Sequence, residues 1–354
     1  MTTTKPRLHY FDVLKGIAIF MVVMGHVITI CVRDIDRTTL FKFISEIHMP
    51  LFFFISGWFT YGVKNGKLKA PRLGARAKQL LLPMIVVSTL WIFYFPHSGL
   101  QSPFDSSFEG LWCSVGKNGY WFPLCLFEII VVYALIRPLF GRIRGVFGSI
   151  LFGTAIWVVL IAVAIVFDGT PIGEIAGLPM LATYWAPFFI GVIASRHRDG
   201  FMRLTQSPVA TTLSLLVGGF ALYYTCWFWE FPLPDCFVWI SRGLLHIALA
   251  IVAIAVVAPW VNNEYAALQP GQQPGRWVRL WTYLGVNSLG IYLLHYFFLF
   301  PMGILRPTLE GLNVSFVPMF VLSAVVAAVV ILITLGLMRI ISVSKPLSTL
   351  LIGK

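Results

Sequence analysis

The chain reads DVLKGIAIFMVVMGH from Asp12 to His26, inside an apolar segment that covers residues 11–32. A segment of that length and composition predicts a helix that spans a membrane. The eleven steps from Lys15 to His26 make about three helical turns, so both side chains lie on one face, roughly 16 Å apart along the axis. Ionisable groups inside a spanning helix are costly and indicate a functional site. The alternative is a lysine that reaches the interface and a histidine that bonds a neighbouring helix.

The composition of the whole chain indicates a polytopic membrane protein. Of its 354 residues, 58% are hydrophobic and only 11% are charged, and the mean hydropathy is +0.85. A net charge of +12 would favour a nucleic-acid partner for a soluble domain. In a membrane protein the same excess of Lys and Arg is typical of cytoplasmic loops, so we expect no nucleic acid. The sequence shows no linker or internal repeat, which predicts one integral-membrane domain over residues 1–354, embedded from about 11 to 341.

Apolar stretches of spanning length predict an all-α bundle of about ten transmembrane helices. They cover residues 11–32, 43–62, 80–96, 119–137, 147–167, 180–194, 209–229, 237–259, 281–303 and 316–341. The basic residues concentrate in every second loop, on the same side as the N-terminus. By the positive-inside rule both termini are therefore predicted to be cytoplasmic, in a multi-pass protein of the bacterial inner membrane.

Polar side chains from several predicted helices reach the same outer level of the membrane. If alternate helices run in opposite directions, His26 and His295 lie at about the same height, in the outer half of the hydrocarbon core. The other polar or aromatic residues at this level are His48, Trp121, Glu128, Arg242 and His246. Taken singly, His48, His246 and Glu128 are each equally well explained as interhelical hydrogen-bonding groups, and Glu128 with Arg242 as a buried ion pair.

Four motifs follow one another along the chain. They are Lys15 and His26 with ten residues between them, IHMPLFFFISGW at 47–58, YWFPLCLF at 120–127 and SLGIYLLH at 288–295. In order and spacing they resemble the integral-membrane acyltransferase 3 family, which includes sugar O-acetylases and fucose 4-O-acetylase-like proteins. The resemblance implies transfer of an acyl group, most often acetyl, from cytosolic acyl-CoA such as acetyl-CoA to a hydroxyl of a carbohydrate or glycan. No metal is expected.

The candidate catalytic residues follow from the chemistry of that transfer. His26 suits the general base that deprotonates the acceptor, or a transient acyl carrier. Arg242, Tyr292 or His295 would stabilise the oxyanion of the tetrahedral intermediate. Lys15 would meet the polar end of the pantetheine arm or a phosphate. Asp12 would orient Lys15 through an i,i+3 contact.

The candidate binding residues fall into two groups. The acceptor side would use His48, Trp121, Glu128, Arg242 and Tyr292. The donor side would use a basic patch for the CoA phosphates, formed by Arg72, Arg76 and Lys78. Gln79 stands where the family tends to carry a second basic residue, so Lys78 or Arg72 would substitute for it. Positive-inside bias alone explains this patch equally well.

Two other classes of protein remain as alternatives. A transporter or flippase for a glycan or a lipid-linked sugar would also place polar residues within the membrane, but would more often show internal repeats and broken helices. A structural or signalling membrane protein would have little reason to bury so many ionisable groups. The acceptor, the acyl group, the use of an acyl-enzyme and the oligomeric state are left open.

Overall fold

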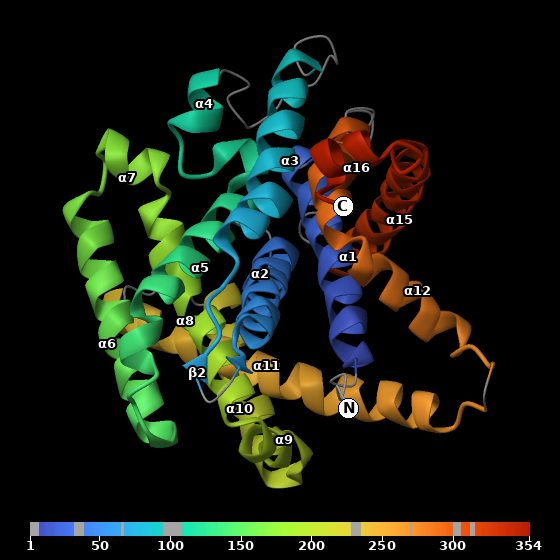
Figure 1. The fold of residues 1–354 in the computed structure, drawn as a ribbon. Coiled ribbons are helices and arrows are strands. Elements are labelled where there is room, and N and C mark those ends of the chain that lie inside the picture. Colours follow the sequence, from blue (N-terminus) through green and yellow to red (C-terminus); the bar gives the residue numbers. More distant parts are fainter. Residues whose placement is uncertain are drawn as a thin grey trace.

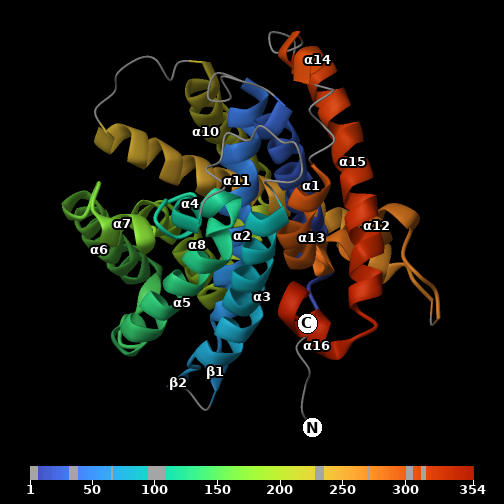
Figure 2. The same ribbon diagram turned by 90° about the horizontal axis from the view of Figure 1, so that it is seen from above.

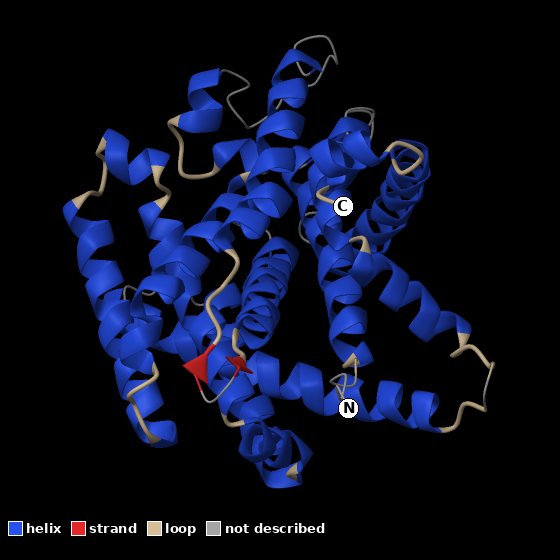
Figure 3. Ribbon diagram, in the orientation of Figure 1, coloured by secondary structure: helices blue, strands red, loops and turns tan. Residues whose placement is uncertain are grey.

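The computed structural model describes residues 7–31, 39–64, 67–94, 108–227, 235–269, 271–299, 306–311 and 316–354. Within these ranges the fold is a bundle of helices, and its strand content is one short hairpin, β1 (Val63–Lys64) with β2 (Lys67–Leu68) (Figure 3). The helices are α1 (His9–Cys31), α2 (Thr39–Thr60), α3 (Leu73–Tyr94), α4 (Phe108–Trp112), η3 (Lys117–Gly119), α5 (Trp121–Phe140), α6 (Gly145–Val166), α7 (Pro171–Ile175), α8 (Leu178–Arg196), α9 (Arg198–Gln206), α10 (Pro208–Trp227), α11 (Asp235–Ala266), α12 (Arg276–Val286), α13 (Ser288–Leu294), η4 (His295–Phe298), α14 (Arg306–Gly311), α15 (Phe316–Ile341) and α16 (Lys345–Ile352). The predicted all-α polytopic bundle is confirmed.

Eight helices in the described part of the chain are long and apolar enough to cross a membrane. The pair α9 and α10 passes the same test as one unit, with a bend of 81° between them, and would make a ninth span. The described residues thus hold eight or nine helices that could span a membrane, against the prediction of about ten. The segment predicted at 281–303 is divided among α12, α13 and the 3-10 helix η4, and only Ser288–Phe298 forms a shorter apolar helix there.

The division of that segment occurs at Asn287, between α12 and α13. The side-chain amide of Asn287 donates to the carbonyl oxygen of Tyr283 at 2.9 Å, and its backbone N–H bonds the same carbonyl at 3.2 Å. Asparagine competes in this way for the backbone groups that would continue a helix. Hydropathy reports how apolar the segment is, but it does not detect a break made by one polar side chain.

Two close helix crossings hold the centre of the bundle together. Gly16 of α1 faces Gly285 of α12, and Gly57 of α2 faces Gly191 of α8. At each of these glycines a Cβ atom would lie only 1.8–2.0 Å from a carbonyl oxygen of the facing helix. Small residues that let backbones approach closely are typical of helix pairs in membranes. The crossings therefore fix how α1 and α2 are rotated within the bundle.

Helices α1 and α2 lie in the middle of the molecule, with α6 and α7 on one side and α12 and α15 on the opposite side (Figures 1 and 2). A Cβ on Gly25 would touch Ile44, so the end of α1 lies beside the beginning of α2. At the other end, Phe11 of α1 packs on Trp58 of α2, with ring centroids 5.2 Å apart. The two helices consequently run in opposite directions. His26 and His48 therefore share one level, and Lys15 lies at the other end of the same interface.

Candidate active site

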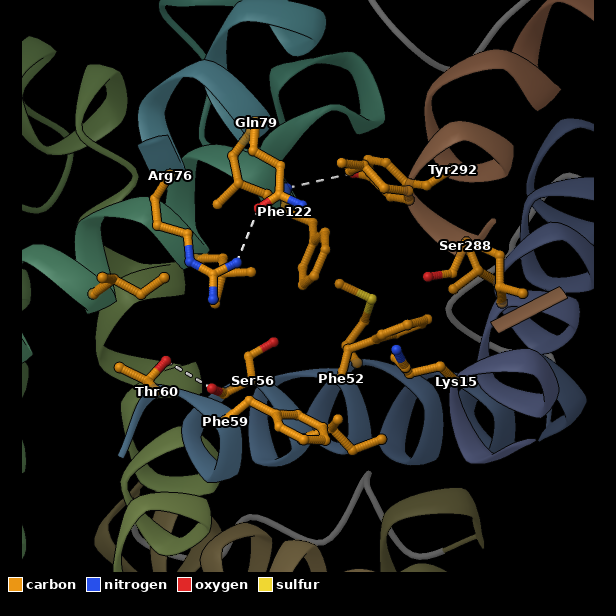
Figure 4. A pocket seen from close by; sticks show the side chains of 18 residues that line it. Lys15, Phe52, Ser56, Phe59, Thr60, Arg76, Gln79, Phe122, Ser288 and Tyr292 are labelled. Atoms are coloured by element: carbon orange, nitrogen blue, oxygen red, sulfur yellow. Dashed lines mark hydrogen bonds between the residues drawn. The ribbon is translucent and has the colours of Figure 1, made fainter. Parts of the chain in front are cut away.

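A cavity of about 190 Å³ opens along one face of α1 (Figure 4). Lys15, Ile19 and Val22 line it from α1, and the next residue on this stripe is His26, one turn beyond Val22. The opposite walls come from α2, α3, α5 and α13 and are largely apolar, with Phe52, Phe122 and Tyr292 among them. The cavity thus follows the stripe from Lys15 to Val22, and His26 lies on the same stripe beyond the residues that line the cavity.

Besides Lys15, polar side chains from α2, α3 and α13 line the cavity. They are Ser56, Thr60, Arg76, Gln79 and, from the start of α13, Ser288 (Figure 4). Arg76 donates to the side-chain oxygen of Gln79 at 2.9 Å. Gln79 itself occupies the wall, whereas Arg72 and Lys78 are exposed and do not line the cavity. Of the three predicted phosphate-binding residues, the structure brings only Arg76 to it.

Asp12 holds Lys15 at this end of the cavity. The carboxylate lies 2.8 Å from the ammonium nitrogen of Lys15, in the expected i,i+3 arrangement. Its other oxygen accepts from Arg7 at 2.8 Å. Because two cations share one carboxylate, the group around Asp12 keeps a net positive charge that suits an anionic ligand.

His26 and His295 form a directed chain of hydrogen bonds. His26 Nδ1 lies 2.7 Å from His295 Nε2, and His295 Nδ1 lies 3.0 Å from the carbonyl oxygen of Ile291. A carbonyl only accepts, so His295 carries its hydrogen on Nδ1 and, when neutral, accepts at Nε2. His26 then carries its hydrogen on Nδ1, and its basic nitrogen is Nε2. The hydroxyl of Tyr296 lies 2.9 Å from that nitrogen and donates to it.

A layer of tyrosines packs around this histidine pair. Tyr292 donates from its hydroxyl to the carbonyl oxygen of Gly119 at 2.5 Å, and Tyr120 donates to that of Leu293 at 3.2 Å. Gly119 also packs against Tyr296, where a Cβ would lie 1.9 Å from the hydroxyl oxygen. Gly119 therefore helps to set where the Tyr296 hydroxyl meets His26.

The turn that carries Gly119 has an unusual backbone. Lys117, Asn118 and Gly119 all have positive φ, at 47°, 49° and 88°. Left-handed conformations of residues other than glycine are strained and cluster at functional sites. The ammonium of Lys117 stabilises the turn, because it donates to the carbonyl oxygens of Trp112, Ser114 and Glu174 at 2.8–2.9 Å. Burial lowers the pKa of Lys117.

A second polar cluster lies beyond His48. The ring Nδ1 of His48 lies 2.5 Å from the carbonyl oxygen of Ile44, and Glu46 precedes His48 by two residues on the same helix. Glu46 lies 3.4 Å from Arg242 Nε and 3.4 Å from His246 Nε2. Polar groups from η4, α1, α2 and α11 are thus brought to one level, as the comparison of depths predicted.

Trp121 and Glu128 are placed differently from each other on α5. Trp121 stacks on Tyr184 with ring centroids 5.0 Å apart, and Tyr184 stacks in turn on Phe53 at 4.6 Å. Glu128 does not pair with Arg242, since Arg242 binds Glu46, so the buried-pair interpretation is wrong. One oxygen of Glu128 has no hydrogen-bond partner among the described residues and faces a small cavity that Lys117 and Trp121 also line.

Residues 8–336 match the acyltransferase 3 family, described as an acyltransferase domain. The chain belongs to this acyltransferase family. The resemblance carried by the four motifs is thereby confirmed, and the protein is a multi-pass membrane acyltransferase.

Two curated relatives of this acyltransferase are nodulation proteins named NolL. The one from Mesorhizobium japonicum is 35% identical over 139 residues, 36% of this chain and 35% of the relative. The one from Sinorhizobium fredii is 42% identical over 79 residues, 21% of this chain and 22% of the relative. The matches therefore span about a third and about a fifth of those proteins' lengths. No solved structure matches the chain.

Several residues around the site of this acyltransferase were missed by sequence analysis. Tyr296 directly follows the fourth motif, which ends at His295, and Glu46 directly precedes the second motif. Both residues are therefore adjacent to residues that the motifs mark. Gln79 departs from the family pattern in the sequence, and in the structure it forms part of the wall of the cavity. Nothing in the sequence marked Lys117, because its role depends on three carbonyl groups that the fold brings together.

Proposed function

We propose that this protein is an O-acyltransferase that moves an acyl group from acyl-CoA to a hydroxyl of a carbohydrate. Acetyl is the first acyl group to test. The observation that carries the proposal is the cavity along the α1 stripe, which has a basic group at Lys15 and leads toward a histidine whose basic nitrogen is defined. A pantetheine arm is long, thin and weakly polar, and it fits a largely apolar passage. The nucleotide, which carries the phosphates, would stay at Lys15 and Arg76.

In this proposal His26 and Tyr296 each take part in a defined step of acyl transfer. The acceptor hydroxyl replaces the Tyr296 hydroxyl at Nε2 of His26 and gives up its proton there, while its oxygen attacks the thioester carbon. The carbonyl electrons move to oxygen, and the oxyanion receives a hydrogen bond from the displaced Tyr296 hydroxyl. When the C–S bond breaks, its electrons go to sulfur, and His26 returns the proton to the CoA thiolate.

This assignment changes the expected roles of the other oxyanion candidates. Tyr292 already donates to Gly119, Arg242 pairs with Glu46, and both ring nitrogens of His295 are engaged. His295 is therefore a positioning residue that keeps the hydrogen of His26 on Nδ1. The aromatic stack of Trp121 and Tyr184 would offer a face for the sugar ring, and Glu46 and His48 would offer hydrogen bonds to its hydroxyls.

The experiment that tests the function uses the purified protein in lipid vesicles with labelled acetyl-CoA and a panel of glycan acceptors analysed by mass spectrometry. The wild-type protein should acylate at least one acceptor, and His26→Ala should lower the rate by about 10²–10⁴, the usual contribution of a general base. Equal acylation by a well-inserted His26→Ala protein would contradict the role of His26. A transporter or flippase would move the glycan without changing its mass and would tolerate His26→Gln.

We further infer that the donor and the acceptor meet this protein from opposite sides of the bacterial inner membrane. The basic loops indicate cytoplasmic termini, which puts Lys15 and Arg76 on the cytoplasmic side and His26, His48 and Trp121 in the outer half. The roughly 16 Å between Lys15 and His26 would be crossed by the pantetheine arm alone, so no phosphate would be buried. The test uses sealed vesicles in which the orientation of the protein is known. Acyl-CoA supplied on the side of the cytoplasmic face should acylate an impermeant acceptor on the opposite side of the membrane. Transfer that requires both substrates in one compartment would refute this arrangement.

A further inference from the structure

The short helix α16 returns the chain to the wall of the donor cavity. It packs against α3 and α13, the helices that carry Gln79 and Ser288 (Figure 2). The helix ends at Gly353, which has a φ of 69°, and the N–H of Lys354 bonds the carbonyl oxygen of Ser348 at 3.3 Å. The left-handed glycine ends the helix and fixes the direction in which the chain leaves it.

Glycine is required at position 353 for a second reason. A Cβ atom there would lie 2.4 Å from the carbonyl oxygen of Gln79, so the turn sits directly on the backbone of α3. The side chain of Gln79 lines the donor cavity and accepts the hydrogen bond of Arg76. The left-handed turn therefore delivers Lys354 to the same part of α3 that carries the predicted phosphate-binding arginine.

The ammonium of Lys354 is held at the break between α12 and α13. Its Nζ donates to the side-chain oxygen of Asn287 at 2.5 Å. Ser288 and Leu289, the next two residues of the chain, line the cavity. Because Asn287 is neutral, it orients the ammonium without cancelling its charge, whereas Lys15 shares the carboxylate of Asp12. A lysine ammonium has three donors, and this contact uses one of them.

We propose that Lys354 is a third phosphate-binding residue of the acyl-CoA site, in addition to Lys15 and Arg76. The inference rests on the proposed acyl-CoA donor. The three cations come from α1, α3 and the turn after α16. Lys15 and Arg76 line the cavity, and Lys354 binds Asn287, which directly precedes the lining residue Ser288. A CoA nucleotide carries a diphosphate and a further phosphate, so several separated cations match it better than one.

The test compares two donors that share the thioester arm and differ in their phosphates. Initial rates are measured with acetyl-CoA and with S-acetylpantetheine for the wild type, Lys354→Gln, Lys354→Arg and Lys345→Gln. Lys345 is the matched control, since it is an exposed lysine at the opposite end of α16. Lys354→Gln should raise the KM for acetyl-CoA by about tenfold, as expected for loss of a charged hydrogen bond, and leave the KM for S-acetylpantetheine unchanged. Lys354→Arg should keep most of the acetyl-CoA affinity.

Each other outcome overturns the inference in a recognisable way. Equal KM values for acetyl-CoA in Lys354→Gln and Lys345→Gln would show that Lys354 does not bind the donor. A fall in kcat with both donors, at unchanged KM, would show that the lysine only supports the helix break. If the wild-type protein transfers no acetyl group from either donor, the proposed function is wrong, and this inference fails with it.

Discussion

Replacing His295 with phenylalanine would remove the acceptor that holds His26 while keeping an aromatic ring at a fully buried position. In the resting protein, His26 Nδ1–H donates to His295 Nε2 across 2.7 Å between two neutral rings. During the reaction His26 takes up a proton, and that hydrogen bond becomes one from a cation. Such bonds contribute about 1.5–3 kcal/mol to stability. At about 1.4 kcal/mol for each factor of ten, their loss from the transition state lowers kcat by about tenfold to 150-fold.

The assay is the initial rate of acyl transfer by His295→Phe, His26→Ala and the double variant in vesicles. The KM for acyl-CoA should not change, because Lys15 and Arg76 are untouched. The double variant should be no slower than His26→Ala, since residues that act as a unit are not additive. The control is His197→Phe, which alters a histidine outside the spanning helices. A His295→Phe protein within threefold of the wild-type kcat, or a double variant clearly slower than His26→Ala, would refute the positioning role.

Two further predictions follow from the walls of the site. Arg76→Gln should raise the KM for acyl-CoA by about tenfold, and Lys78→Gln should raise it less, because of these two residues only Arg76 lines the cavity. Both KM values are measured at the same salt concentration. Equal increases would mean that Arg76 and Lys78 act only through their total charge. Gly119→Ala should lower kcat at least about tenfold, because a methyl group there meets the Tyr296 hydroxyl at 1.9 Å and a positive φ disfavours alanine. Gly116→Ala, three residues earlier with open space around it, is its control, and similar kcat values for the two proteins would contradict the link from Gly119 to Tyr296.

Much of the site could be anticipated from the sequence, because a helix has a fixed period and a fixed rise. These two constants placed Lys15 and His26 on one face, and the cavity follows that face through Ile19 and Val22. The same constants, with alternating helix directions, brought His48 to the level of His26. The contact between Asp12 and Lys15 is also local, being set by the i,i+3 spacing alone.

Only the tertiary structure decided which groups touch. The bond between His26 and His295, the donation from Tyr296 to His26 and the pairing of Arg242 with Glu46 each join helices far apart in the sequence. Periodicity describes positions within one helix, but it does not give the rotation of that helix against its neighbours.

In this protein that rotation is set by backbone packing. The crossings at Gly16 with Gly285 and at Gly57 with Gly191 bring helices so close that each can adopt one orientation. The break at Asn287 depends likewise on one side chain inside an apolar segment, and hydropathy averages over such a residue. The sequence by itself therefore determined the helices and their polar faces. The contacts between faces were decided by how closely the backbones pack, since a rotation of one helix moves its side chains to different partners without changing its hydrophobicity.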